Sequence, residues 1–177
     1  MDNMELLQYP IGRFEPPSRL TPDQRALLLH QIAALPGELR AAVTGLTSAQ
    51  LDTAYRPGGW TVRQLVHHLA DSHMHAYLRF KWAVTEESPT IKPYDEKRWS
   101  ELPEARSGEI RISLVLLEAL HERWVLFLRS LGEEDFARHF HHPELGEVPL
   151  WRNLALYGWH GRHHLAHITG LKQRMGW

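Results

Sequence analysis

Hydrophobic residues recur along four stretches of the chain at spacings of three, four and seven, which is the period of an amphipathic α-helix. The expected long helices span about 21–43, 61–87, 108–131 and 149–175. None of the remaining sequence alternates convincingly between polar and apolar residues, as a half-buried strand would. We therefore predict an all-α protein, a four-helix bundle with long connecting loops, for which simple up-and-down order is not assured.

Residues that cap helices mark two of these boundaries. Thr21 followed by Pro22 is typical of a helix start, with threonine as the N-cap and proline in the first turn. Thr61, with Gln64 three residues later, predicts a capping box at the start of the second long helix. The Pro-Gly pair at 36–37 either kinks or ends the first helix, because proline removes a helical hydrogen bond.

The apolar rows of the last two helices indicate which faces meet the core. In the third helix the expected row is Ile112, Leu116, Leu120, Trp124 and Leu128. In the fourth helix the row is Leu150, Leu154, Tyr157, Gly161, His164, Ile168, Leu171 and Met175. His164 therefore faces the core, and Gly161 is expected to leave empty volume beside it.

The segments between the helices are distinguished by proline and glycine. Residues 1–20 contain three prolines and show no helical period, so we expect an extended arm lying across the body. A short helical turn is expected over 48–53. Residues 88–107 again contain three prolines and form a long loop, which packs on the body as a lid would. Residues 139–146 are a further loop, and the whole chain, 1–177, is interpreted as one domain.

Composition excludes several classes of function. The 177 residues carry a net charge of -1 with histidines neutral, which argues against partners such as nucleic acid or an acidic membrane. The absence of cysteine excludes disulfides and a thiolate nucleophile, and fits a reducing cytoplasm. Residues 1–17 lack the apolar segment of a signal peptide, and no apolar run reaches the roughly 20 residues of a membrane span. We expect a cytoplasmic protein that acts on a small molecule.

Histidine is the outlier, with 13 copies. Eleven fall into three clusters: His67, His68, His73 and His75; His139, His141 and His142; and His160, His163, His164 and His167. Clustering of this kind favours a metal site. The pairs 160/164 and 163/167 have the i,i+4 spacing that stacks two imidazoles on one helical face. The pair 160/164 is the better inward-facing chelate, because His163 is expected to be the most solvent-facing of the four.

The second long helix leaves the third ligand open. His73 falls on its apolar row between Leu69 and Ala76, so periodicity alone favours His73 as the buried histidine. His68 lies to one side of that row, and His67 lies nearly opposite it. Because metal sites at the end of a bundle also use flanking positions, the pattern does not decide which of these side chains completes a site.

Longer motifs provide information that periodicity does not. The stretches concerned are Gly59–Met74, Trp159–Ile168, Tyr9–Gly12, Leu51–Arg56, Arg79–Lys81, Pro93–Leu102 and Arg174–Trp177. They resemble the DinB-like superfamily nearly end to end, and most closely its YfiT branch of metal-dependent hydrolases. The sixteen residues of Gly59–Met74 are the most specific part of this resemblance.

The resemblance implies a DinB-like four-helix bundle with a three-histidine metal site. The family's first ligand, the histidine immediately before Leu-Ala-Asp, corresponds to His68 here. The other two, a histidine after tryptophan and one four residues later, correspond to His160 and His164, the pair that the apolar row also favours. Members of the branch are described as homodimers that bind zinc or nickel, so we expect a homodimer with one such ion per chain.

Three imidazoles with an open position are typical of a catalytic metal. We expect the ion to activate water for attack on an ester, amide or similar bond of a small substrate. One alternative is a transferase that activates a low-molecular-weight thiol such as bacillithiol, and another is a metal-binding stress protein without turnover.

The sequence leaves alternatives open for the groups around the ligands. Asp71 either orients a ligand or is a surface acid. Whether the histidines of 139–142 or the loop 88–107 line the site stays open.

Overall fold

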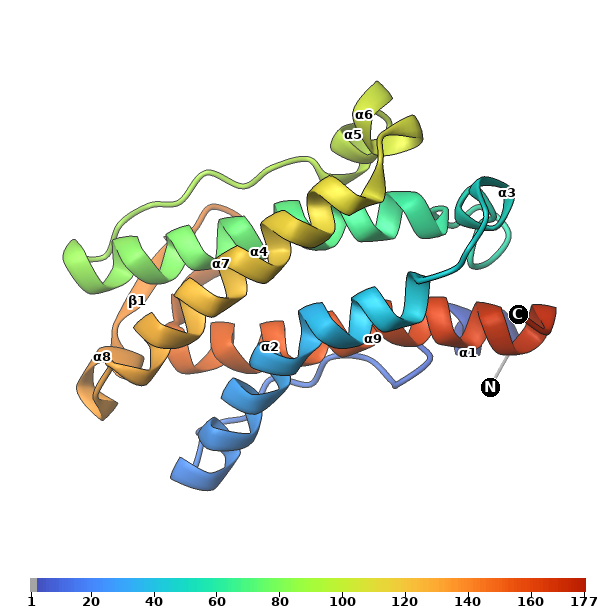
Figure 1. Ribbon diagram of the computed structural model, residues 1–177. Coiled ribbons are helices and arrows are strands. Elements are labelled where there is room, and N and C mark those ends of the chain that lie inside the picture. The colour runs from blue at the N-terminus through green and yellow to red at the C-terminus, as the bar shows by residue number, and fades with distance from the viewer. Residues whose placement is uncertain (1–2) are drawn as a thin grey trace.

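The computed structural model describes residues 3–177 as a bundle of long helices, as predicted. The long helices are α2 (Pro22–Val43), α4 (Val62–Thr85), α7 (Ile110–Arg129) and α9 (Leu150–Met175), shown side by side in Figure 1. The short helix α1 (Asn3–Gln8) precedes them. The connections between the long helices contain α3 (Ser48–Leu51), α5 (Glu96–Ser100), α6 (Pro103–Ser107), α8 (Glu133–Ala137), β1 (His139–His142) and β2 (Gly146–Pro149). No helix of this part of the chain is both long and apolar enough to cross a membrane.

The four long helices do not follow up-and-down order. Helix α2 packs mainly against α7 and α9, and α4 packs against the same two helices. Consecutive long helices α2 and α4 therefore occupy opposite corners, as do α7 and α9. The connections 44–61 and 130–149 cross the bundle, and this crossing brings α4 and α9 side by side although they are far apart in sequence (Figure 1).

Both predicted helix starts are confirmed by their hydrogen bonds. The Gln24 amide N–H donates to Thr21 Oγ1 at 3.2 Å, and Gln24 Oε1 accepts from the Thr21 amide at 2.9 Å. Thr61 and Gln64 form the same box at the start of α4, with distances of 3.2 and 2.9 Å. Pro36 lies inside α2, which continues to Val43, so the proline does not end the helix.

The prediction that residues 139–146 form only a loop is wrong. Strands β1 and β2 form an antiparallel hairpin with His139 opposite Pro149 and His142 opposite Gly146. Phe140 and Val148 face the core, whereas the alternate positions are more exposed. The strands have four residues each and one of them is rich in histidine, so the alternation is too short and too polar to recognise in the sequence.

Two further segments contain helices that the sequence did not predict. The arm expected over 1–20 includes α1, and its first two residues lie outside the described part of the chain. The loop expected over 88–107 includes α5 and α6, the former capped by Asp95 Oδ1, which accepts from the Arg98 amide at 3.0 Å. Helices of five or six residues are too short to show an apolar period.

The predicted core row of α7 is wrong over its first half. Ile112 and Leu116 are 62% and 44% exposed. The buried face instead carries Leu114, Leu117, His121, Trp124, Val125 and Leu128. The row of α9 is confirmed except at its exposed end, Met175.

The space beside Gly161 is filled. A Cβ on Gly161 would lie 2.5 Å from Leu35 Cδ2, so the expectation of empty volume there is corrected. The glycine instead permits the close approach of α2 to α9.

The apolar core is divided into two clusters along the bundle. One contains Ile32, Phe80, Trp124, Leu150 and Leu154, and the other contains Leu39, Leu65, Leu69, Leu117 and Ile168. On α4, α7 and α9, the residues between the two clusters include histidines: His73, His121, His160 and His164. The bundle thus encloses a polar layer between two apolar ones.

Candidate metal centre

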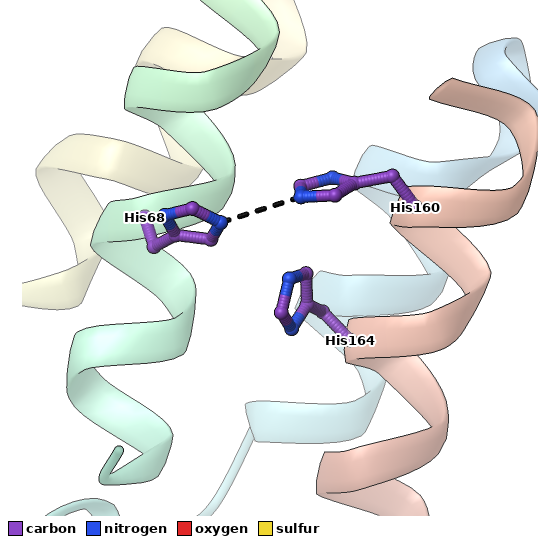
Figure 2. A group of neighbouring side chains, drawn as sticks. All are labelled: His68, His160 and His164. Carbon is purple, nitrogen blue, oxygen red and sulfur yellow. Dashed lines mark hydrogen bonds between the residues drawn. The ribbon is translucent and has the colours of Figure 1, made fainter. Parts of the chain in front are cut away.

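Three histidines from two helices converge in this polar layer. His68 on α4 points toward His160 and His164 on α9, as Figure 2 shows. One ring nitrogen of each side chain lies within 4.8 Å of the corresponding nitrogens of the other two. His68 Nε2 and His160 Nε2 are separated by 3.3 Å. The structure therefore brings together the three side chains that the family resemblance selected.

Burial keeps these three imidazoles neutral. It lowers the pKa of His68 to about 3, because desolvation disfavours the cation. Burial also lowers the pKa values of His160 and His164 well below the ordinary range, and the neighbouring histidines lower them further. Each ring consequently offers a nitrogen lone pair near neutral pH, which is the form that binds a metal ion.

The donor set fits a divalent transition metal. Tetrahedral coordination with bonds of about 2.0–2.1 Å places imidazole nitrogens about 3.4 Å apart. The 3.3 Å between the Nε2 atoms of His68 and His160 agrees with that spacing. Three protein ligands leave a coordination position free, which distinguishes catalytic from structural sites.

The second nitrogen of each candidate ligand also has a partner. Tyr94 Oη lies 3.4 Å from His68 Nδ1. His73 Nε2 lies 3.3 Å from His160 Nδ1, and His167 Nδ1 lies 3.4 Å from His164 Nδ1. Partners of this kind fix the orientation of a ligand ring. His73 is buried, as periodicity predicted, but it supports a candidate ligand and is absent from both candidate ligand groups.

Asp71 is not among the partners of the ligand rings that the structure describes. Its carboxyl is partly buried, and desolvation together with nearby Glu104 raises its pKa to about 6. The proposed orienting role of Asp71 stays a prediction.

Two residues near the ligands, His121 and Tyr94, were not predicted from the sequence to be hydrogen-bond partners in the site. His121 could have been recognised as a buried histidine, because it shares a face of α7 with Leu117, Trp124 and Leu128.

A second group of histidines on α9 also has metal-binding spacing. His163, His164 and His167 bring one nitrogen each within 4.8 Å of one another. The prediction that His163 faces solvent is wrong, since it is only 7% exposed and stacks on Trp159 with ring centroids 4.3 Å apart. The ring of Tyr9, in the N-terminal segment, also lies next to that of His163, with centroids 6.0 Å apart. The two candidate metal sites share His164, so they differ in their other two ligands: His68 and His160 in the first, His163 and His167 in the second.

The first group opens onto a cleft of about 940 Å³. His68, His160 and His164 line it together with Arg79, Pro93, Tyr94, Asp95, Glu96, Lys97, His142 and Glu144. The segment 93–97 of the long connection therefore lines the site, which the sequence left open. Of the histidines in 139–142, His142 lines the cleft, whereas His139 Nε2 lies 2.7 Å from Ser88 Oγ and forms a hydrogen bond with it.

Comparison with known proteins places the chain in a family. A model of the DinB superfamily matches residues 31–168. The chain belongs to the DinB superfamily. This DinB protein is 52% identical over 174 residues to a Bacillus cereus (strain 03BB102) protein named "Putative metal-dependent hydrolase", covering 98% of this chain and 100% of the relative. It is 50% identical over 172 residues to YfiT of Bacillus subtilis (strain 168), with 97% of each chain covered.

Solved structures agree with this assignment. YfiT from Bacillus subtilis, described as "a probable metal-dependent hydrolase with an unusual four-helix bundle topology", superposes with a TM-score of 0.95 at 49% identity. That match covers 97% of this DinB protein and 99% of YfiT. The four-helix bundle protein TT2238 matches with a TM-score of 0.55 at 18% identity, over 82% of this chain and 98% of TT2238, which supports the fold alone.

Proposed function

We propose that this DinB protein is a metal-dependent hydrolase in which His68, His160 and His164 hold one zinc or nickel ion. The observation that carries the proposal is the convergence of three neutral imidazoles on one cleft. The names of the relatives, which include metal-dependent hydrolases at about half identity over nearly the full chain, support the same activity. The homodimer expected from the resemblance stays a prediction.

The ion would supply Lewis acidity, which lowers the pKa of a coordinated water and provides a nucleophile near neutral pH. The chain's own residues shape the surroundings. Burial raises the pKa of Tyr94, so its hydroxyl keeps its proton and stays available as a hydrogen-bond partner of His68. The ring of Trp60 lies 4.6 Å from that of His68 and covers one side of it.

The cleft fits a polar substrate of small size. Its lining includes the cations Arg79 and Lys97 and the anions Asp95, Glu96 and Glu144. Arg79 lines the cleft, and its Nε is buried without a hydrogen-bond partner among the described residues. Charged groups of both signs favour a substrate with polar or ionic substituents over a purely apolar one.

The first experiment tests which histidines hold the metal. Elemental analysis is made on protein purified without a histidine tag, comparing wild type with His68→Ala and His163→Ala. His164 is unsuited to this comparison because it belongs to both histidine groups. We expect about one zinc or nickel per chain in the wild type and in His163→Ala, and loss in His68→Ala. The reverse pattern would place the metal in the second group.

The second experiment tests the reaction. The zinc- and nickel-loaded forms are assayed against a panel of small esters and amides, with and without bacillithiol. Hydrolysis without added thiol, lost in His160→Ala, is the expected result. Turnover of electrophiles only when bacillithiol is present would replace the hydrolase by a thiol transferase. Equal turnover by the metal-free protein would contradict any metal-dependent reaction.

A further inference from the structure

We propose that two chains of hydrogen-bonded histidines, each ending on a main-chain carbonyl, hold His160 and His164 in the tautomer whose Nε2 carries no hydrogen. The inference rests on the proposed metal site, because it explains how two of its ligands present their lone pairs. A neutral imidazole has one N–H and one bare nitrogen, and only the bare nitrogen binds a metal ion. Which nitrogen is bare is set by the partner of the other one.

The first chain begins at a carbonyl that helix α2 leaves without its usual donor. Pro36 has no N–H, so it cannot donate to the Ile32 carbonyl four residues earlier. His121 Nδ1 lies 2.6 Å from this oxygen. A carbonyl oxygen only accepts, so the hydrogen is on His121 Nδ1. Burial lowers the pKa of His121 to about 4, which leaves the ring neutral and its Nε2 an acceptor.

The hydrogen positions then follow along the chain. His121 Nε2 lies 2.9 Å from His73 Nδ1, so His73 donates through Nδ1. The Nε2 of His73 is then an acceptor, and it lies 3.3 Å from His160 Nδ1. His160 must donate through Nδ1, and its Nε2 is left bare. That atom is the one facing His68 across the candidate metal site.

The second chain fixes the tautomer of His164 in the same way, starting from the Gln8 carbonyl. Gln8 is the last residue of α1, where helix carbonyls have no intrahelical donor. His167 Nε2 lies 3.1 Å from the Gln8 carbonyl oxygen and donates to it. Its Nδ1 then accepts from His164 Nδ1, at 3.4 Å, which leaves His164 Nε2 bare. Tyr55 stacks on the His167 ring, with centroids 3.9 Å apart, and holds it in place.

His68, the third ligand, differs from the other two because its partner, Tyr94, does not fix which atom of the hydrogen bond is the donor. The Tyr94 hydroxyl can donate to or accept from His68 Nδ1. In the metal-free protein the bare Nε2 of His160 requires His68 to donate through Nε2. With a metal ion held at His68 Nε2, the hydrogen of the neutral ring would be on Nδ1, where the Tyr94 oxygen would accept it. One ligand therefore changes tautomer on metal binding, and two do not.

Long-range ¹H–¹⁵N imidazole spectra of the metal-free and zinc-loaded protein test this assignment. We expect His160 and His164 to carry the hydrogen on Nδ1 in both forms, and His68 to change from the Nε2–H to the Nδ1–H form. In His121→Phe we expect His160 to populate the Nε2–H tautomer as well, with His164 unchanged. In His167→Phe we expect His164 to do so, with His160 unchanged. Each variant is thus the control for the other. An Nε2–H form of His160 or His164 in wild type, or no response to either variant, would overturn the proposal.

Zinc affinity provides a second readout. Loss of a partner that orients a ligand costs about 10–100-fold in affinity. We expect an increase of this size in Kd for His167→Phe, and a smaller increase for His121→Phe, which reaches His160 only through His73, both measured by chelator competition. His121→Gln keeps a polar side chain and should lose less. His67→Phe is the matched control: His67 is buried on α4 and bonds to Ser113 rather than to a ligand, so Kd should be unchanged.

The two proposals fail in different ways. If the wild type binds no metal, the proposed function fails, whereas the tautomers of the metal-free protein still test the histidine chains. If zinc binds through His68 but Kd is the same in wild type, His121→Phe and His167→Phe, the metal site stands and the chains have no role in it. Circular dichroism of each variant verifies that the helices are formed before either result is interpreted.

Discussion

Replacement of Gly161 by alanine tests how closely α9, which carries two of the candidate ligands, packs on α2. An added Cβ would lie 2.5 Å from Leu35 Cδ2, 3.2 Å from its Cδ1 and 3.3 Å from its Cγ. Carbon atoms in contact are ordinarily about 3.5–4.0 Å apart. Leu35 is itself buried, so its side chain has little room to turn away. Overpacking of this kind costs about 1–3 kcal/mol.

An opposing effect must be separated from this cost. Alanine is more favourable than glycine inside a helix by about 0.8–1.0 kcal/mol. Gly170 lies in the same helix, and a Cβ there would meet only Arg174 Nη1, at 3.4 Å, near the end of a flexible side chain. We therefore expect Gly170→Ala to stabilise the protein by up to about 1 kcal/mol. Gly161→Ala should be less stable than Gly170→Ala by about 1–3 kcal/mol.

Denaturant unfolding of the metal-free protein measures both variants, with a constant m-value as evidence that the midpoints report stability. Leu35→Ala removes the clashing atoms and by itself should cost about 2–5 kcal/mol. In the double variant the new methyl group occupies part of the vacated space, so the two costs should not add, with a coupling of about 1 kcal/mol or more. Equal stability of Gly161→Ala and Gly170→Ala, or simple additivity with Leu35→Ala, would refute the packing argument.

Two further predictions concern the site and its surroundings. Zinc at 100 times its Kd should raise the free energy of unfolding of the wild type by about 2.7 kcal/mol and have no effect on His68→Ala. Calorimetry that shows equal stabilisation of wild type and His68→Ala would place the ion elsewhere. Burial and Glu104 raise the pKa of Asp71 to about 6, so this carboxyl binds its proton more tightly in the folded than in the unfolded state, and its own contribution to stability is lost as pH rises from about 4 to 6. The buried histidines, whose pKa values are lowered, act in the opposite direction, so the contribution of Asp71 is measured as the difference between wild type and Asp71→Asn. We expect Asp71→Asn to be more stable than wild type by about 1 kcal/mol at pH 7.5, allowing for partial exposure, and this difference to shrink toward pH 4. A difference in denaturant unfolding that does not change with pH would contradict the prediction.

The parts of the fold that depend on local sequence were predictable. Long helices repeat their apolar residues often enough to be recognised, and the capping boxes at Thr21 and Thr61 involve residues only three positions apart. The short turn predicted over 48–53 is present as α3, but the hairpin and the other short helices, α1, α5, α6 and α8, were missed because each strand or helix has only four to six residues, which is too few for a period. The contact that fills the space at Gly161 comes from Leu35, 126 positions earlier, and nothing local to α9 indicates it.

The exposure of His163 was predicted wrongly for a related reason. Rotation around α9 places His163 away from the apolar row, and in an isolated bundle that face would meet water. In the structure Tyr9 and Trp159 cover the ring. Helical periodicity describes the packing of the long helices on one another, but it has no information about an N-terminal segment that returns to cover their outer faces.

Helix α4 shows why periodicity could not choose its ligand. An apolar row identifies the buried face only if the opposite face meets solvent. From Val62 to Ala70 every residue of α4 is buried, because α5 and α6 cover the side that α7 and α9 leave free. His67, His68 and His73 are therefore all buried and have three different roles: a bond to Ser113, a candidate ligand, and support of His160. Burial does not separate these roles; the partner of each ring nitrogen does, and those partners come from α7, α9 and the loop before α5.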